Sequence, residues 1–149
     1  MNRHAKALEL DKVLGLLEKE TGCADAARLA RELEPASSLF EAQRLMKETD
    51  DAYRLMARFG TPSFGQMKNV DNALRRAEAG ASLSLRELLD IAETLRVIRS
   101  VSDWRRHCEG METSLDDRFS ALAPNKYLEE KIGAVVVSEE EIADNASPA

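Results

Sequence analysis

Four residues of this chain have side chains that commonly bind metals or act as nucleophiles: His4, Cys23, His107 and Cys108. No two of them have the C-x-x-C or H-x-x-x-H spacing that brings two zinc ligands together. His107 and Cys108 are adjacent, so on a helix they point in different directions. We interpret them as a surface histidine beside a small apolar cysteine, and we predict no metal site.

Catalytic and nucleotide-binding patterns are also missing from the sequence. A nucleophilic site needs a nucleophile, a base and an orienting group, and two histidines leave little to build one from. The adjacent acids at 116–117 and 129–130 are typical of a solvated helix face. Seven glycines are scattered, and neither G-x-x-x-x-G-K-S/T nor G-x-G-x-x-G occurs. We therefore predict that this chain has no catalytic residues, binds no cofactor and is not itself an enzyme.

Basic residues are the one group with a spatial pattern. Arg96, Arg99 and Arg106 have a spacing that places them on one helix face, with Arg105 and His107 beside them. One interpretation is a nucleic-acid contact in which these arginines bind phosphates. The other is a solvated face whose arginines pair with nearby acids, namely Glu93, Asp103 and Glu109. The spacing alone leaves both interpretations open.

Composition limits the class of protein. The chain has 149 residues, the usual size of one domain, with 44% hydrophobic and 32% charged residues. Residues 1–109 carry 18 basic and 18 acidic residues, whereas residues 110–149 carry three and nine, which gives the net charge of −6. An acidic chain is a poor autonomous nucleic-acid binder. The sequence has no signal peptide, no membrane-spanning run and no disulfide framework, so we expect a soluble cytoplasmic protein without a membrane partner.

Apolar residues recur at helical spacing along most of the chain. Helices are predicted at residues 10–17, 25–33, 38–59, 70–79, 84–104, 115–122 and 127–132. The two longest begin with S-x-x-E capping boxes, at Ser38 and Ser84. Residues 134–137 are the only strand candidate. The sequence thus predicts an all-α, irregular bundle of about five to seven helices in one domain over 1–149. It allows at most one short β hairpin near 134–143. The end, 138–149, is acidic, and flexibility is one interpretation of it.

The apolar stripes are most simply core. Met46 and Tyr53 in one long helix, and Leu95 and Trp104 in the other, are predicted to pack inside the bundle. A stripe of this kind also suits docking of a partner, so a complete helical adaptor is an alternative. A small nucleic-acid-binding module that uses Arg96, Arg99 and Arg106 is a second alternative.

Several segments, in order and at matching distances, resemble one protein family. They are ALELDKVL (7–14), LEP (33–35), PSFG (62–65), VDNALRRAE (70–78), LSLRELLDIA (83–92) and IADNASP (142–148). Together these segments resemble the N-terminal core region of the second-type bacterial MutS proteins. That branch is described as an endonuclease that suppresses recombination, and it is linked to rescue of collided ribosomes.

The resemblance implies that this chain is a truncated part of a longer polypeptide. Family members continue into a lever helix, a clamp, an ATPase with Walker motifs and usually a nuclease domain. The parent would then be a dimeric ATPase and endonuclease of DNA repair that uses ATP and Mg²⁺ in domains absent here. This chain would be a non-catalytic core segment between clamp and ATPase, and its first partner would be the remainder of its own polypeptide. DNA or ribosomes would bind through the full-length protein.

Overall fold

The computed structural model describes residues 8–65 and 67–138, and within them it forms seven helices. Their bounds are α2 Leu10–Lys19, α3 Ala24–Arg31, α4 Leu39–Phe59, α5 Asp71–Glu78, α6 Leu85–His107, α7 Asp116–Ser120 and α8 Lys126–Val135. The described residues form no sheet, so the all-α prediction is confirmed.

One expectation about the C-terminal region is wrong. Residues 134–137 were the strand candidate, but α8 continues through Val135 and only Val136 is extended after it. The helix prevails because Asn125 caps it with a side-chain oxygen that accepts from Leu128 N at 3.0 Å. Ile132 and Val136 can then pack from one side of this turn into the core. The rest of the predicted hairpin and acidic end, from residue 139 on, lies outside the described residues.

The two long helices begin at the predicted caps. Ser84 and Glu87 form the full reciprocal box: Glu87 N donates to Ser84 Oγ at 3.3 Å, and Ser84 N donates to the Glu87 carboxylate at 2.9 Å. At α4, Glu41 N donates to Ser38 Oγ at 3.2 Å, but the Glu41 carboxylate accepts from Ser37 N instead. Both helices therefore start one residue after their serine.

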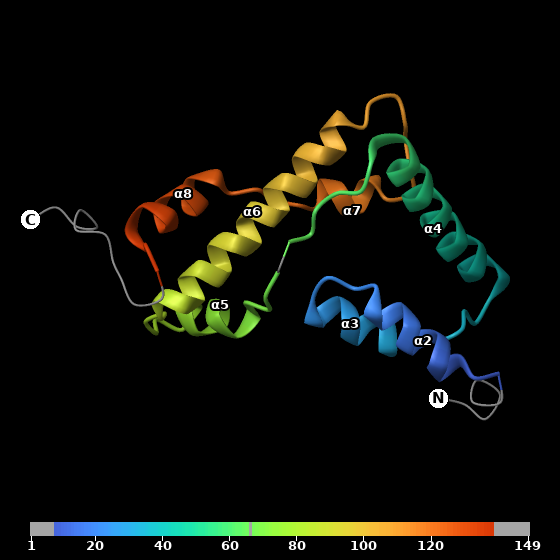
Figure 1. Cartoon of the computed structure of the whole chain (residues 1–149), viewed down its shortest axis with the longest axis horizontal. Helices are drawn as coiled ribbons and strands as arrows, with labels where there is room; N and C mark the ends of the chain where they lie inside the picture. The colour runs from blue at the N-terminus through green and yellow to red at the C-terminus, as the bar shows by residue number, and fades with distance from the viewer. Residues whose placement is uncertain (1–7, 66, 139–149) are drawn as a thin grey trace, which may run out of the picture.

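Helix α6 is the central element of the molecule. In Figure 1 it crosses the middle of the view, with α5 and α8 along its first half and α7 near its end. The core cluster at its first half contains Ala73 from α5, Ile91 from α6, and Ile132 and Val136 from the α8 region. Leu95 is half-buried and packs against this cluster.

Helices α2 and α3 form a separate hairpin at one side of the molecule (Figure 1). Arg31 of α3 donates from Nε to the Glu18 carboxylate of α2 at 2.6 Å, which joins the two helices. Asn69 Nδ2 donates to Asp25 Oδ2 at 2.7 Å and links the hairpin to the segment before α5. Within the hairpin only Ala30 is buried, and Val13, Leu16 and Leu29 are all exposed.

A second expectation, the burial of Met46 and Tyr53 on α4, also differs from the structure. Met46 and Tyr53 were predicted to be core residues, yet 73% and 67% of their surface is exposed. The prediction that they pack within this chain is wrong, because α4 turns its opposite face, with Asp51 and Leu55, toward the rest of the molecule. Periodicity identifies an apolar stripe but does not show what covers it.

Candidate functional site

The three arginines predicted to share a face lie on α6, and each pairs with a carboxylate. Arg96 donates from Nε to the Glu93 carboxylate at 3.0 Å, and Arg106 forms an ion pair with Asp103. Glu93 and Asp103 each lie three positions earlier on the same helix, which is neighbouring spacing on a helix surface. The side chains of Arg96 and Arg106 remain exposed, so these pairs are weak and solvated.

Arg99 has a structural partner on another helix. Its Nε and Nη2 donate to the two carboxylate oxygens of Glu129 on α8 at 2.9 and 2.8 Å. The hydrogen bonds and charge of Arg99 lower the pKa of Glu129, and those of Glu129 raise the pKa of Arg99. This two-pronged contact fastens α8 to α6. Arg99 is therefore engaged within the chain, while contact of Arg96 and Arg106 with nucleic acid stays a prediction.

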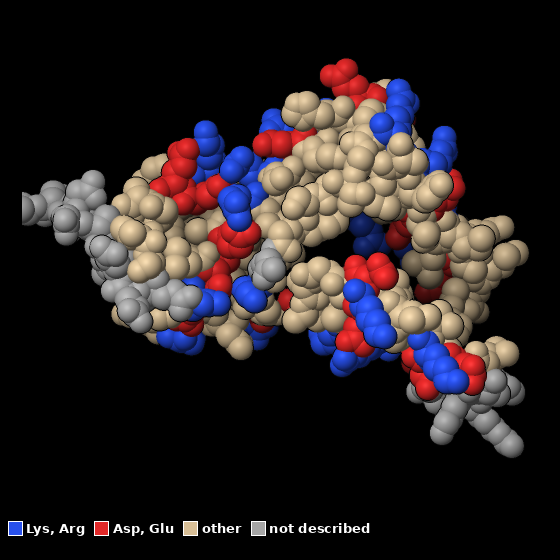
Figure 2. Space-filling model, viewed as in Figure 1, with Lys and Arg blue, Asp and Glu red and all other residues tan. Residues whose placement is uncertain are grey.

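Charge on the face shown in Figure 2 is mixed rather than segregated. Basic and acidic side chains alternate there, and no continuous basic band crosses the surface. A phosphate-binding surface normally concentrates Lys and Arg on one face. The ion pairs of Arg96, Arg99 and Arg106 favour the interpretation in which the α6 arginines belong to a solvated, ion-paired face.

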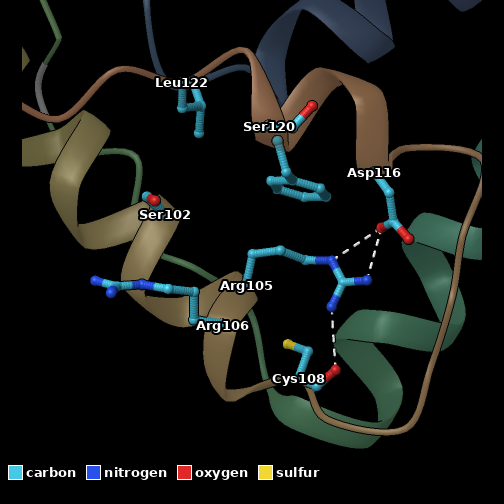
Figure 3. Close-up of a pocket in the computed structure, with 8 residues that line it drawn as sticks. Ser102, Arg105, Arg106, Cys108, Asp116, Ser120 and Leu122 are labelled. Atoms are coloured by element: carbon cyan, nitrogen blue, oxygen red, sulfur yellow. Dashed lines mark hydrogen bonds and ion pairs between the residues drawn. The ribbon is translucent and has the colours of Figure 1, made fainter.

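Arg105, which the sequence marked only as a neighbour of the arginine face, organises the end of α6 (Figure 3). Its guanidinium donates to Asp116 Oδ1 at 3.0 and 2.6 Å, to the Cys108 carbonyl at 3.0 Å and to the Met111 carbonyl at 2.8 Å. Burial opposes ionisation of Asp116, but hydrogen bonds from Thr113 and Arg105 outweigh it and lower the pKa of this carboxyl. These contacts fix the loop that joins α6 to α7.

The same loop holds α4 through a buried carboxylate. Asp51 of α4 is only 2% exposed, and its Oδ2 accepts from Ser114 N at 2.8 Å and from Ser114 Oγ at 2.7 Å. Lys47 Nζ adds a third bond at 2.9 Å. The Ser114 bonds, followed by Lys47, hold the pKa of Asp51 well below its usual range. A second link joins Glu48 of α4 to Arg118 of α7 at 2.8 Å. We call these two links the α4 clasp.

Sequence reasoning did not find the α4 clasp. Asp51 and Ser114 are 63 positions apart, and Glu48 and Arg118 are 70 apart. The one available signal was an acidic residue, Asp51, close to the apolar positions Ala52 and Leu55 of a helix. Carboxylates are rarely buried without partners, so such a residue suggests a polar contact without identifying its partner.

A cavity of about 440 Å³ lies between the end of α6 and α7 (Figure 3). Its lining comprises Ser102, Arg105, Arg106, Cys108, Asp116, Phe119, Ser120 and Leu122. Burial raises the pKa of the Cys108 thiol, which donates to the Trp104 carbonyl at 3.3 Å, so this thiol stays protonated and unreactive. Arg105 and Asp116 are occupied with each other. The lining therefore contains no activated nucleophile paired with a base.

Trp104 lies half-buried beside this cavity. Its ring and that of Phe119 are 6.0 Å apart between centroids and tilted by 49°. This contact is within the range of favourable aromatic pairs, and it joins α6 to α7. The indole nitrogen is buried and has no hydrogen-bond partner among the residues that the structure describes.

Residues 8–65 and 67–138 contain neither a metal-binding cluster nor a membrane-spanning helix. No three His, Cys, Asp or Glu side chains there converge in a way that would hold a metal ion. His107, one of the four candidates, has its Nδ1 at 2.7 Å from the Asp103 carbonyl, and Cys108 is buried at the helix end. No helix in these ranges is both long and apolar enough to span a bilayer.

Known proteins resemble this chain along nearly its whole length. No protein-family model matches it. It is 36% identical over 147 residues to a protein named Endonuclease MutS2 from Acetivibrio thermocellus, which covers 96% of this chain and 18% of that relative. It is 34% and 33% identical over 146 residues to proteins of the same name from Clostridium acetobutylicum and Ruminiclostridium cellulolyticum, again with 97% of this chain and 18% of each relative covered.

This chain is similar to only one part of each of these longer relatives. The chain spans about a fifth of the length of these curated relatives. It is thus related, over nearly all its residues, to a small part of Endonuclease MutS2. These comparisons support the resemblance to second-type bacterial MutS proteins, as a similarity to part of such a protein.

Proposed function

We propose that this chain is the N-terminal part of the helical core of a MutS2-like polypeptide, a non-catalytic segment that connects clamp and ATPase. The observation that carries the proposal is the similarity over 96% of this chain to 18% of a relative. The sequence has no phosphate-binding motif, and the cavity between the end of α6 and α7 contains no activated nucleophile. Both observations accord with a structural role. Neither alternative, the adaptor or the nucleic-acid module, gains support from the contacts of Arg96, Arg99 and Arg106.

The geometry suits transmission of movement between domains. Helix α6 is 23 residues long and is fastened to α8 by Arg99–Glu129 and to the α7 region by Arg105–Asp116. The α4 clasp attaches a second long helix to the loop after α6 and to α7. Helices held by such contacts can move together as a rigid body. Passing a nucleotide-dependent displacement to a distant site requires movement of this kind.

The activities of the whole polypeptide belong to its other parts. The relatives are named endonucleases, and the polypeptide proposed here would be an ATPase and endonuclease acting as a cytoplasmic homodimer. It would bind DNA in repair and suppression of recombination, or collided ribosomes, or both. Two observations support binding of ATP and Mg²⁺ elsewhere: G-x-x-x-x-G-K-S/T is missing from the sequence, and residues 8–65 and 67–138 hold no carboxylate cluster for a metal. Both would bind outside this chain.

The proposal is tested by comparing the 149-residue chain with the full polypeptide that the gene encodes. ATP hydrolysis and binding to a labelled four-way DNA junction and to ribosomes are measured for both. We expect hydrolysis and at least one binding activity from the full polypeptide, and neither from the chain alone. Salt-dependent DNA binding by the chain alone, lost on changing Arg96, Arg99 and Arg106 to Ala, would instead support the nucleic-acid module.

A further inference from the structure

Helix α4 presents two opposite faces with different chemistry. Glu48, Asp51 and Leu55 face the rest of the chain, and two of them are buried while Glu48 is 17% exposed at its side chain. Leu39, Met46 and Tyr53 follow one another at intervals of seven and are 75%, 73% and 67% exposed. At 100° per residue, the two sets point in directions about 180° apart. The clasp therefore holds α4 with its apolar side turned outward.

The outward side is a continuous apolar stripe. It consists of Leu39, Leu45, Met46, Tyr53 and Met56, which we call the α4 stripe; all five are among the exposed large hydrophobic residues. An open depression of about 510 Å³ lies along it, lined by Leu45, Met46, Thr49, Asp50 and Tyr53. The spacing and the depression match the groove in which a second helix packs its side chains.

We propose that the α4 stripe is the docking surface for an apolar-faced helix from the remainder of a longer polypeptide. This inference rests on the proposed function, since the docking helix would come from residues of the longer polypeptide outside these 149. The relatives are more than five times as long as the region matched here, which leaves ample chain to supply such a helix. Asp50 at the rim of the depression favours a docking helix with a basic residue beside its apolar seam.

The size of the stripe argues for a covalently connected partner. The α4 stripe is a small surface, because it consists of five side chains on one helix and two of them, Leu45 and Met56, are only 37% and 39% exposed. A stable interface between separate proteins buries about 800 Å² on each side. A helix in the same polypeptide needs less, because its effective concentration is high.

A second copy of this chain fits the stripe less well. Two α4 helices packed antiparallel about a two-fold axis near Thr49 would bring the two Asp50 carboxylates close together. Like charges across such a seam are destabilising. Arg54 Nη1, the ion-pair partner of Asp50, is 3.9 Å from its Oδ2, so the charge of this carboxylate is incompletely neutralised.

Cysteine accessibility tests the proposal without disturbing the fold. Met46→Cys and Tyr53→Cys are each introduced, with Phe40→Cys as the matched control, in a Cys23→Ser background that keeps the buried Cys108. Phe40 is 78% exposed and lies on α4 away from the stripe. The rate of modification by a small maleimide is measured in the 149-residue chain and in the full polypeptide.

We expect all three thiols to react rapidly in the 149-residue chain. In the full polypeptide, the thiols at 46 and 53 should react about tenfold or more slowly, since modification then requires local opening, while the thiol at 40 keeps its rate. Equal rates at 46 and 53 in both proteins would overturn the docking proposal and leave the proposed function standing. Equal protection at position 40 would overturn it as well, because the effect would not be specific to the stripe.

Two other outcomes are separable. Protection in the 149-residue chain that grows with protein concentration would identify a second copy as the occupant and overturn the assignment made here. A gene that encodes only these 149 residues would overturn the proposed function, and with it the source of the docking helix, before any labelling is done.

Discussion

Individual residues hold α4, α7 and the end of α6 together through polar contacts. Asp51 and Arg105 are the two centres of these contacts, and each satisfies backbone groups of the loop between α6 and α7. A loop whose backbone polar groups are paired in this way is ordered without being apolar. Their loss should therefore loosen α4 and α7 together.

The charge on Asp51 makes stability depend on pH. Because its pKa in the folded chain is lowered from 3.8, its contribution is fully present above the unfolded pKa. That contribution is lost as pH falls below about 4 toward the folded pKa. We expect the melting temperature of the original chain to fall more steeply than that of Asp51→Asn between about pH 5 and pH 3. Circular dichroism measures both curves, and the difference between them removes the effect of other carboxyls. Parallel curves would contradict the role given to Asp51.

Trp104 should carry packing energy that exposed aromatic residues do not. Replacing Trp104 with Ala removes the contact with Phe119 and leaves a cavity, for which we expect a loss of about 3 kcal/mol in the free energy of unfolding. Tyr53→Ala is the control, since that ring is 67% exposed; we expect a change within about 0.5 kcal/mol. Urea unfolding followed by circular dichroism measures both. Equal losses for the two variants would show that Tyr53 is also packed.

At the scale of elements, the connections between helices depend on close contacts at a few positions. Gly65 lies in the loop between α4 and α5 with φ of +55°, and a Cβ there would lie 3.0 Å from Val97 Cγ2 and 3.1 Å from Glu93 Oε1 on α6. Glycine allows this loop to lie directly on α6. The loop thereby carries the chain from α4 past the central helix to α5.

Two glycine substitutions should have opposite signs. Gly65→Ala requires both a left-handed backbone and displacement of α6 side chains, so we expect a loss of about 1–3 kcal/mol in stability. Gly15→Ala lies within α2, where an added Cβ meets no atom within 4 Å, so we expect a gain of about 0.5–1 kcal/mol. Thermal and urea unfolding of the two variants measure the signs. A stabilised Gly65→Ala would mean that the loop does not contact α6 as described.

The elements were predictable from sequence where their determinants are local. The serine caps at Ser38 and Ser84 each depend on a few neighbouring residues. Helices α4, α5 and α6 begin and end within a few residues of the predicted positions. The strand candidate at 134–137 failed because a short run of β-branched residues has no period that separates strand from buried helix.

At the scale of the whole molecule, sequence could not show which face of each helix turns inward. The apolar side of α4 was expected in the core, and the structure instead turns Asp51 inward because Ser114 supplies two hydrogen bonds from a distant loop. The contact between Arg99 and Glu129, 30 positions apart, was equally hidden. Nonlocal polar contacts of this kind leave no periodic signal in the sequence.

Few side chains of this chain are buried. This accords with a segment whose core is completed by further residues of a longer polypeptide. Among residues that the structure describes, Leu55 is the one large side chain buried almost completely, at 1% exposure. Large apolar residues on α2, α3 and α4 remain exposed. Isolated globular domains seldom leave such patches uncovered. Under the proposed function, we therefore expect another part of the longer polypeptide to cover these residues.

The central claim is that these 149 residues are a structural segment of a longer MutS2-like polypeptide. Its most direct test is to read the gene beyond the codon for Ala149. The account predicts an open frame that continues in phase and encodes G-x-x-x-x-G-K-S/T further on. A stop codon directly after Ala149 would contradict the account, and the exposed face of α4 would then have to be explained by a separate partner.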